Sequence, residues 1–164
     1  MESLYSTAWI GLGSNLEDPR NQITEAINCL RQVDWLIVDR VSSLYQTAPV
    51  GAFDQPDFIN AVARIITELA PVTLLDRLLK VECQFGRIRD GSRNRPRQLD
   101  LDLLLYGQER FITRELILPH PRLHKRLFVL RPLMELEGDV EIPGVGSISS
   151  CIDACEWQRI TKLY

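Results

Sequence analysis

The sequence predicts an α+β fold in which helices pack on an antiparallel sheet. Within the first 106 residues, apolar patterns follow one another in the order strand, helix, strand, strand, helix, strand. This is the order of a ferredoxin-like sandwich, which has its helices on one sheet face and leaves the other face available for a site. Later residues predict extra C-terminal helices. With 164 residues in all, we expect one domain over residues 1–164.

Composition excludes several classes of protein. With 45% hydrophobic and 25% charged residues, the chain is typical of soluble globular proteins. Without an apolar run of about 18 residues or a basic, apolar leader, we expect no membrane contact and a cytoplasmic location. The net charge of -3 argues against a nucleic-acid partner. Without secretory context we expect reduced, partly buried thiols at Cys29, Cys83, Cys151 and Cys155. No histidine or further pair lies near Cys151 and Cys155 to complete a zinc site.

The first strand and helix are predicted from residues 5–12 and from the segment after Asp18. Asp18 supplies an N-cap and Pro19 the first helical position, and apolar residues recur at helical spacing over 23–30. The glycines of residues 11–15 indicate a turn after the strand. A phosphate cradle is the less favoured alternative there, because the longer glycine pattern of phosphate loops is incomplete.

Residues 36–45 lean toward a strand with blurred alternation, and a loop follows over 46–57. Residues 58–67 give the clearest strand, with Phe58 and Asn60 on one face and small apolar residues on the other. An aromatic ring and an amide two residues apart can stack on a flat heterocycle and bond its edge. A core phenylalanine and a strand-end amide is an equally simple interpretation.

A second helix begins at Pro71 and carries apolar residues at intervals of three and four. Glu82 lies on or beside its buried stripe, so this carboxylate needs a partner or borders a cavity. A rim glutamate paired with Arg87 or Arg89 is the alternative.

The segment 87–106 joins an arginine-dense loop to a strand with two carboxylates. Asp100 and Asp102 leave one face of the strand expected over 99–106, with Cα atoms roughly 6.7 Å apart. Carboxylates on one face can bind cations, and guanidinium groups match phosphate oxygens. The arginines are Arg87, Arg89, Arg93, Arg95 and Arg97.

Two histidines follow, His120 and His124. Prolines on both sides of His120 make a continuous helix and a two-histidine metal face unfavourable, so we interpret His120 as a loop residue that reaches a phosphate or ribose. Residues 126–134 predict a short helix with Pro132 near its end, and residues 148–155 predict another.

Five motifs together resemble those of the 6-hydroxymethyl-7,8-dihydropterin pyrophosphokinase family of folate biosynthesis. The resemblance runs from about residue 8 to residue 133, and the family's fold is ferredoxin-like with extra helices. The motifs occupy residues 11–16, 55–60, 86–89, 96–102 and 118–121.

The resemblance implies transfer of diphosphate from ATP to the pterin hydroxymethyl group, leaving AMP. It implies ATP and the pterin as the partners, two Mg²⁺ ions held by Asp100 and Asp102, and Arg87 and Arg97 as further catalytic groups. We also expect a monomer. The nucleotide contacts it implies are Glu82, Arg87, Arg89, Arg97, Leu103, His120 and Arg126. The pterin contacts it implies are Phe58 and Phe128 as a ring sandwich, with Asn60, Thr47 and the backbone near Val50 on the hydrogen-bonding edge.

Three positions depart from the family pattern: Ala48, Asn94 and Glu115, the last with Arg114 adjacent as a possible substitute. Arg93 and Arg95 have no assigned role. The alternatives are an RNA-binding module, which leaves the two aspartates unexplained, a metal-dependent nuclease, and a noncatalytic regulatory domain of the same fold.

Overall fold

The computed structural model describes residues 3–49, 54–86 and 98–164. In chain order its elements are β1 (Ser6–Ser14), α1 (Pro19–Gln32), β2 (Ile37–Val41), β3 (Leu44–Thr47), β4 (Phe58–Thr67), α2 (Pro71–Gln84), β5 (Asp100–Tyr106), β6 (Phe111–Ile112), β7 (Ile117–Leu118), the 3-10 turn η1 (Leu123–Lys125), α3 (Leu127–Glu137), β8 (Glu141–Ile142), β9 (Gly146–Ser147), α4 (Ile148–Asp153) and β10 (Ile160–Leu163). No helix in these ranges is both long and apolar enough to cross a membrane.

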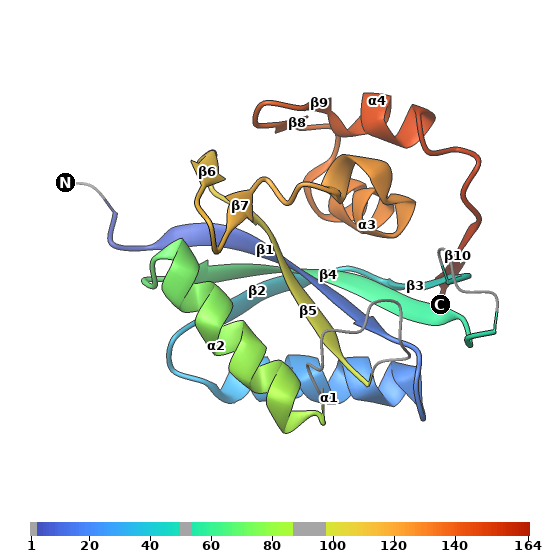
Figure 1. Cartoon of the computed structure of the whole chain (residues 1–164), viewed down its shortest axis with the longest axis horizontal. Coiled ribbons are helices and arrows are strands. Elements are labelled where there is room, and N and C mark those ends of the chain that lie inside the picture. The colour runs from blue at the N-terminus through green and yellow to red at the C-terminus, as the bar shows by residue number, and fades with distance from the viewer. Residues whose placement is uncertain (1–2, 50–53, 87–97) are drawn as a thin grey trace.

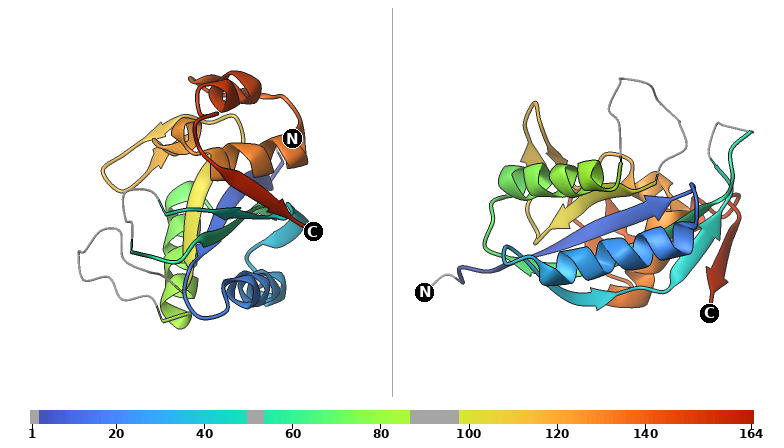
Figure 2. Two further views of the ribbon diagram at one scale, coloured as in Figure 1. Left: turned by 90° about the vertical axis from the view of Figure 1, so that its right-hand side faces the viewer. Right: turned by 90° about the horizontal axis from the view of Figure 1, so that it is seen from below.

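The main sheet confirms the ferredoxin-like arrangement. Its strand order is β10-β3-β4-β1-β5, and β2 also pairs with β4. β1 lies between β4 and β5 and is antiparallel to both. Figure 1 shows α1 and α2 on one side of this sheet, and both views of Figure 2 agree. The fold class predicted from the element order is therefore correct.

A continuous apolar core lies between the sheet and these two helices. Each helix begins with a proline, and the Asp18 side chain accepts from the backbone N–H of Asn21 at 3.3 Å, as an N-cap does. The buried helix residues face alternate residues of β4, including Ala61 and Ile65. β4 begins at Phe58 and α2 begins at Pro71, both as predicted.

The opposite sheet face is less open than the sequence suggested. α3 packs there and α4 lies on the far side of α3 (Figure 1), and residues of both helices form a second core with Val62, Leu104 and Leu105. The extra C-terminal helices were predicted, but their position over this face was not. The part of this face beside Asn60, Asp100 and Asp102 is what remains for a site.

Several element boundaries differ from the prediction. The run 36–45 is two strands, because Ser42 interrupts it: its backbone N–H donates to Val62 O and its Oγ accepts from Val62 N–H, both at 2.9 Å. β1 continues to Ser14, through the glycines interpreted as a turn. α3 continues five residues past Pro132.

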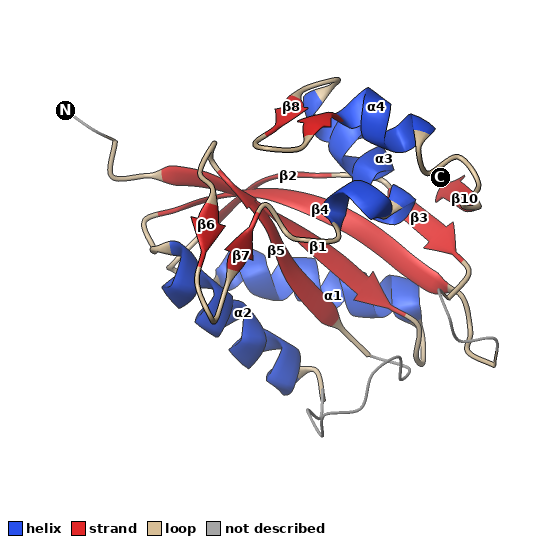
Figure 3. Ribbon diagram, turned by 45° about the horizontal axis from the view of Figure 1, so that its top comes forward, coloured by secondary structure: helices blue, strands red, loops and turns tan. Residues whose placement is uncertain are grey.

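The chain end adds a strand that the sequence did not reveal. β10 pairs with β3 at the sheet edge, where Figure 3 shows the two side by side. The cysteines are free thiols, as expected, but their burial varies: Cys151 and Cys155 are buried, Cys29 is partly buried and Cys83 is exposed.

Candidate functional site

Three neighbouring strands bring the predicted site residues into one row. Gly13 of β1 lies opposite Asn60 of β4 on one side and opposite Asp100 of β5 on the other. Directly opposed residues share a sheet face, and successive strands lie about 4.8 Å apart. An amide, a glycine and a carboxylate therefore follow one another across the face. Two residues along, Gly11 lies opposite Asp102 in the same way.

Gly13 stands in the middle of this row and places no side chain between Asn60 and Asp100. A Cβ at this position would lie 3.2 Å from Asn60 Oδ1 and 4.0 Å from both Asp100 Cβ and Phe58 Cδ1. Any side chain here would thus stand among the groups that the sequence assigned to pterin and metal. The absence of one gives a flat ligand room to approach the strand backbone.

Asn60 is oriented by Thr47. The Asn60 amide Nδ2 donates to Thr47 Oγ1 at 3.0 Å, and both side chains are buried. This bond leaves Asn60 Oδ1 turned toward Gly13. Since the Thr47 hydroxyl accepts that bond, it keeps its own hydrogen to donate. The pair presents an acceptor and a donor, and half-buried Phe58 lies opposite Thr47.

Arg126 links the second carboxylate to the start of α3. Its Nη1 lies 3.5 Å from Asp102 Oδ2, and its Cζ lies 5.6 Å from the centre of the Phe128 ring. Both side chains of the ion pair are about one quarter to one third exposed. Arg126 thus contacts both Asp102 and Phe128, which come from distant parts of the chain.

Among the described residues, no group of three or more acidic, histidine or cysteine side chains could enclose a metal. Asp100 and Asp102 are both partly exposed and share a strand face. Such an incomplete carboxylate set suits Mg²⁺, which keeps several waters and takes further oxygens from phosphates. The residues fit the predicted metal.

Glu82 closes the sheet edge behind the two carboxylates. The Glu82 side chain is fully buried, and its Oε1 accepts from the backbone N–H of Leu101 at 2.7 Å. β5 is an edge strand, so N–H groups that point away from β1 need a partner from outside the sheet. α2 thereby holds the backbone between Asp100 and Asp102. The proposed nucleotide contact of Glu82 stays a prediction.

We expect Glu82→Ala to lower the free energy of unfolding by about 1–3 kcal/mol, because the buried Leu101 N–H loses its acceptor. Urea unfolding followed by circular dichroism measures the change. Asp76→Ala, at an exposed position of the same helix, is the control and should stay within about 0.5 kcal/mol of the wild type. Equal losses in the two variants would contradict the role of this hydrogen bond.

His120 is held against the same edge of β5. Its backbone N–H donates to Leu104 O at 2.8 Å, and its Nδ1 accepts from the backbone N–H of Arg122 at 3.1 Å. Burial, and then the charges of Arg126 and Arg122, lower the pKa of His120 to about 4, against an opposing effect of Asp100. The ring is neutral at pH 7 and carries its hydrogen on Nε2, a donor suited to a phosphate or ribose oxygen.

The depressed pKa of His120 predicts a fall in stability as the pH is lowered from about 6.5 to about 4. In this window the unfolded chain binds a proton at His120 that the folded chain does not, so acid favours unfolding. Urea unfolding at pH 7 and pH 5 measures the fall. The fall in stability should be smaller in His120→Gln than in the wild type and unchanged in His124→Gln. The same fall in the wild type and both variants would refute the prediction.

One predicted nucleotide contact, Leu103, does not share the sheet face of the two carboxylates. Leu103 is buried in the core beneath α1 and α2, on the face opposite Asp102. The predictions for the arginine loop and for the backbone near Val50 concern residues outside the described ranges: Val50, Arg87, Arg89, Arg93, Asn94, Arg95 and Arg97.

The sequence also missed features of the site. Asn15, interpreted as part of a turn, is buried, and its Nδ2 donates to Gln55 Oε1 at 3.1 Å and to Pro56 O at 3.3 Å. It thereby ties the end of β1 to the segment that leads into β4. Gly13 was assigned to the same turn, and only its pairing with two strands reveals its place in the site.

Comparisons with known proteins agree on one family. The family described as 7,8-dihydro-6-hydroxymethylpterin-pyrophosphokinase (HPPK) matches residues 9–138. The 2-amino-4-hydroxy-6-hydroxymethyldihydropteridine pyrophosphokinase of Haemophilus influenzae is 41% identical over 96% of this chain and 98% of its own, and that of Pseudomonas aeruginosa is 40% identical over 98% of each. The crystal structure of wild-type Plasmodium falciparum HPPK-DHPS with pteroate superposes with a TM-score of 0.72 at 13% identity. The match covers 94% of this chain and 43% of that one, which supports the fold alone.

Proposed function

The chain belongs to the 7,8-dihydro-6-hydroxymethylpterin-pyrophosphokinase family, and we propose that the sheet face bearing Asn60 and Asp100 is where it transfers diphosphate from ATP to 6-hydroxymethyl-7,8-dihydropterin. The hydroxymethyl oxygen forms a bond to the β-phosphorus of ATP, and the bond from that phosphorus to the α-phosphate oxygen breaks, leaving AMP. The row from Asn60 through Gly13 to Asp100 carries the proposal, because it sets a place for a flat ring beside a carboxylate.

The ring binds at the Asn60 end of this row. The acceptor of Asn60 and the donor of Thr47 match the alternating donors and acceptors on the edge of a pterin. Phe58 and Phe128 contribute the two stacking faces, and the missing side chain at Gly13 lets the ring approach the strand backbone. This group of residues is called the pterin slot below.

The phosphates bind at the Asp100 end. Asp100 and Asp102 hold Mg²⁺, which when bound neutralises phosphate charge and aligns the phosphates of ATP with the attacking oxygen. Arg126 is paired to Asp102, and its guanidinium is the type of group that binds phosphate oxygens. His120 donates from Nε2, and the predicted roles of Arg87 and Arg97 complete the phosphate side.

Three further expectations are part of the same proposal. Residues 1–164 form a single pyrophosphokinase domain, the enzyme acts as a monomer, and it works in the cytoplasm. The high coverage of the Haemophilus influenzae and Pseudomonas aeruginosa relatives supports the first of these.

The pterin slot is tested with Asn60→Ala. Loss of the bonds that Asn60 makes to the ring edge should raise the KM for the pterin by about tenfold, while the KM for ATP changes little. Gln46→Ala is the control, because this amide lies on β3 next to Thr47 but bonds Asp57 at 3.0 Å in an exposed pair. An unchanged pterin KM in Asn60→Ala would refute the slot.

A further inference from the structure

Glu135 of α3 accepts hydrogen bonds from Tyr45 of β3, the strand that carries Thr47, and from Ser43 just before that strand. Its Oε1 accepts from the backbone N–H and the Oγ–H of Ser43, both at 2.8 Å, and its Oε2 accepts from the Tyr45 hydroxyl at 2.5 Å. Lys162 of β10 lies 4.0 Å from the same Oε2. One carboxylate thus joins α3 to β3 and to the strand beyond it.

The strand end of this contact belongs to one wall of the pterin slot. Tyr45 lies directly opposite Asn60 in the sheet and two residues before Thr47, so all three side chains share one sheet face. Tyr45 is 6% exposed. A shift of β3 relative to α3 would therefore move Thr47, and with it the amide of Asn60.

The helix end belongs to the other wall. Phe128 and Glu135 are seven residues apart, which is two helical turns, so they lie on the same side of α3. Arg131 lies between them and its charge acts on Tyr45, as expected if this side of the helix faces β3. The contact at Glu135 therefore sets where Phe128 stands relative to the sheet.

We propose that Tyr45 and Glu135 are positioning residues that fix the spacing between the sheet wall of the pterin slot, Asn60 and Thr47, and its helix wall, Phe128. The inference rests on the proposed pterin slot and adds residues that do not touch the ring themselves.

The chemistry of the pair suits a rigid spacer. Burial, followed by the bond to Glu135, raises the pKa of Tyr45 well above its usual value, so the phenol keeps its proton. Burial tends to raise the pKa of Glu135, but the bonds from Tyr45 and Ser43 outweigh it and lower that pKa. A neutral donor thus meets a charged acceptor, which gives short and strong hydrogen bonds.

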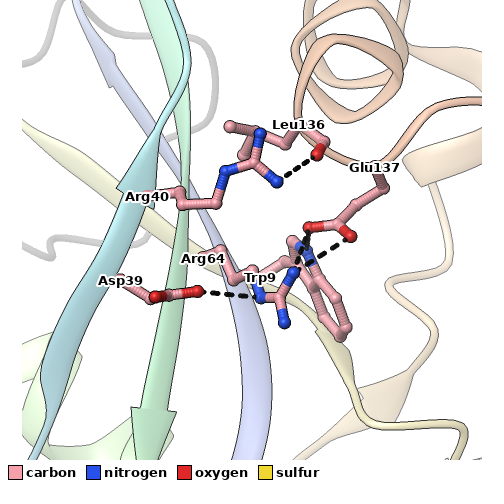
Figure 4. Close-up of polar contacts among 6 residues, drawn as sticks. All are labelled: Trp9, Asp39, Arg40, Arg64, Leu136 and Glu137. Carbon is pink, nitrogen blue, oxygen red and sulfur yellow. Dashed lines mark hydrogen bonds and ion pairs between the residues drawn. The ribbon is translucent and has the colours of Figure 1, made fainter.

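A second anchor of α3 supplies a matched control. Glu137 Oε1 accepts from Trp9 Nε1 at 3.0 Å, its Oε2 lies 3.3 Å from Arg64 Nη1, and Arg40 donates to Leu136 O at 2.7 Å. Figure 4 shows these contacts, with Asp39 on the far side of Arg64. They hold the end of α3 to β1, β2 and β4 but involve no residue of β3 or of the slot.

The experiment measures kcat, both KM values and the melting temperature for Tyr45→Phe, Glu135→Gln and the double variant. Each single change should raise the pterin KM roughly threefold to tenfold, the range for a residue that acts through a neighbour, with the ATP KM and kcat within about twofold. The double variant should be no worse than the poorer single variant, because the pair acts as one unit. Glu137→Gln should lower the melting temperature and leave the pterin KM unchanged.

Two results would overturn the inference. One is a lower melting temperature with all kinetic constants unchanged in Tyr45→Phe and Glu135→Gln, which would make the pair merely stabilising. The other is an equal rise of the pterin KM in Glu137→Gln, which would indicate general loosening of α3. Phe128→Ala, measured in parallel, distinguishes failure of the pterin slot from failure of the positioning role. An unchanged pterin KM in Phe128→Ala refutes the slot itself. A pterin KM that rises in Phe128→Ala but not in Tyr45→Phe or Glu135→Gln refutes only the positioning role.

Discussion

Asp102→Asn should lower turnover by roughly 10²-fold or more at saturating Mg²⁺, the scale on which one preorganised charged group acts in an active site. The amide keeps the size of the carboxylate and can still accept from Arg126, 3.5 Å away in the wild type. What it removes is the negative charge that the metal needs. Asp100 and Asp102 are the two carboxylates of β5, so this strand has no third carboxylate to replace the one that is lost.

The measurement is steady-state formation of AMP over a range of Mg²⁺ concentrations. Asp153→Asn, at the exposed end of α4, is the control and should behave as wild type. Addition of a chelator should abolish turnover of the wild type, and an excess of Mg²⁺ should then restore it. Near-normal turnover of Asp102→Asn at saturating Mg²⁺ would refute the metal assignment.

Gly13→Ala should raise the KM for the pterin by about 10- to 200-fold, the effect of one misplaced carbon in a fitted pocket. The new methyl group would lie 3.2 Å from Asn60 Oδ1 and among Phe58 and Asp100. Because 3.2 Å is tighter than an ordinary contact, the methyl group would displace the Asn60 amide and cover the strand backbone at this point. The KM for ATP should change far less, because the phosphates bind at the other end of the row.

Gly11→Ala is a close control for this change. It lies on the same strand and face, two residues earlier, but its methyl group would meet only the Leu104 side chain at 3.5 Å, an ordinary contact. Kinetics with each substrate varied in turn, and urea unfolding of both variants, separate loss of binding from loss of stability. Equal pterin KM values in Gly13→Ala and wild type would show that the ring does not approach the strand at Gly13.

Strong local patterns predicted the elements that build the site. The alternation over β4 and the proline at the start of α2 were sufficient to place both, and the period of two on β5 put Asp100 and Asp102 on one face. The element order then gave the ferredoxin-like arrangement. These features are encoded in neighbouring residues, so a single sequence reveals them.

Features that depend on contacts between distant segments could not be predicted. Glycine signals a turn, yet Gly13 lies inside β1, where its meaning comes from two strands far away in sequence. Helical spacing predicted Glu82 on or beside the buried stripe and in need of a partner, but nothing local indicates that this partner is the backbone N–H of Leu101 on a sheet edge. Likewise, neither Tyr45 nor Glu135 shows in the sequence that the two side chains meet across 90 positions.

On the proposed mechanism, this sheet face couples cleavage of ATP to a pterin acceptor. The most direct test mixes the purified protein with Mg²⁺, ATP and 6-hydroxymethyl-7,8-dihydropterin and follows AMP and the pterin diphosphate by chromatography. We expect both products in equal amounts, and neither when the pterin is left out. AMP formed without the pterin, or ADP formed in place of AMP, would contradict the account.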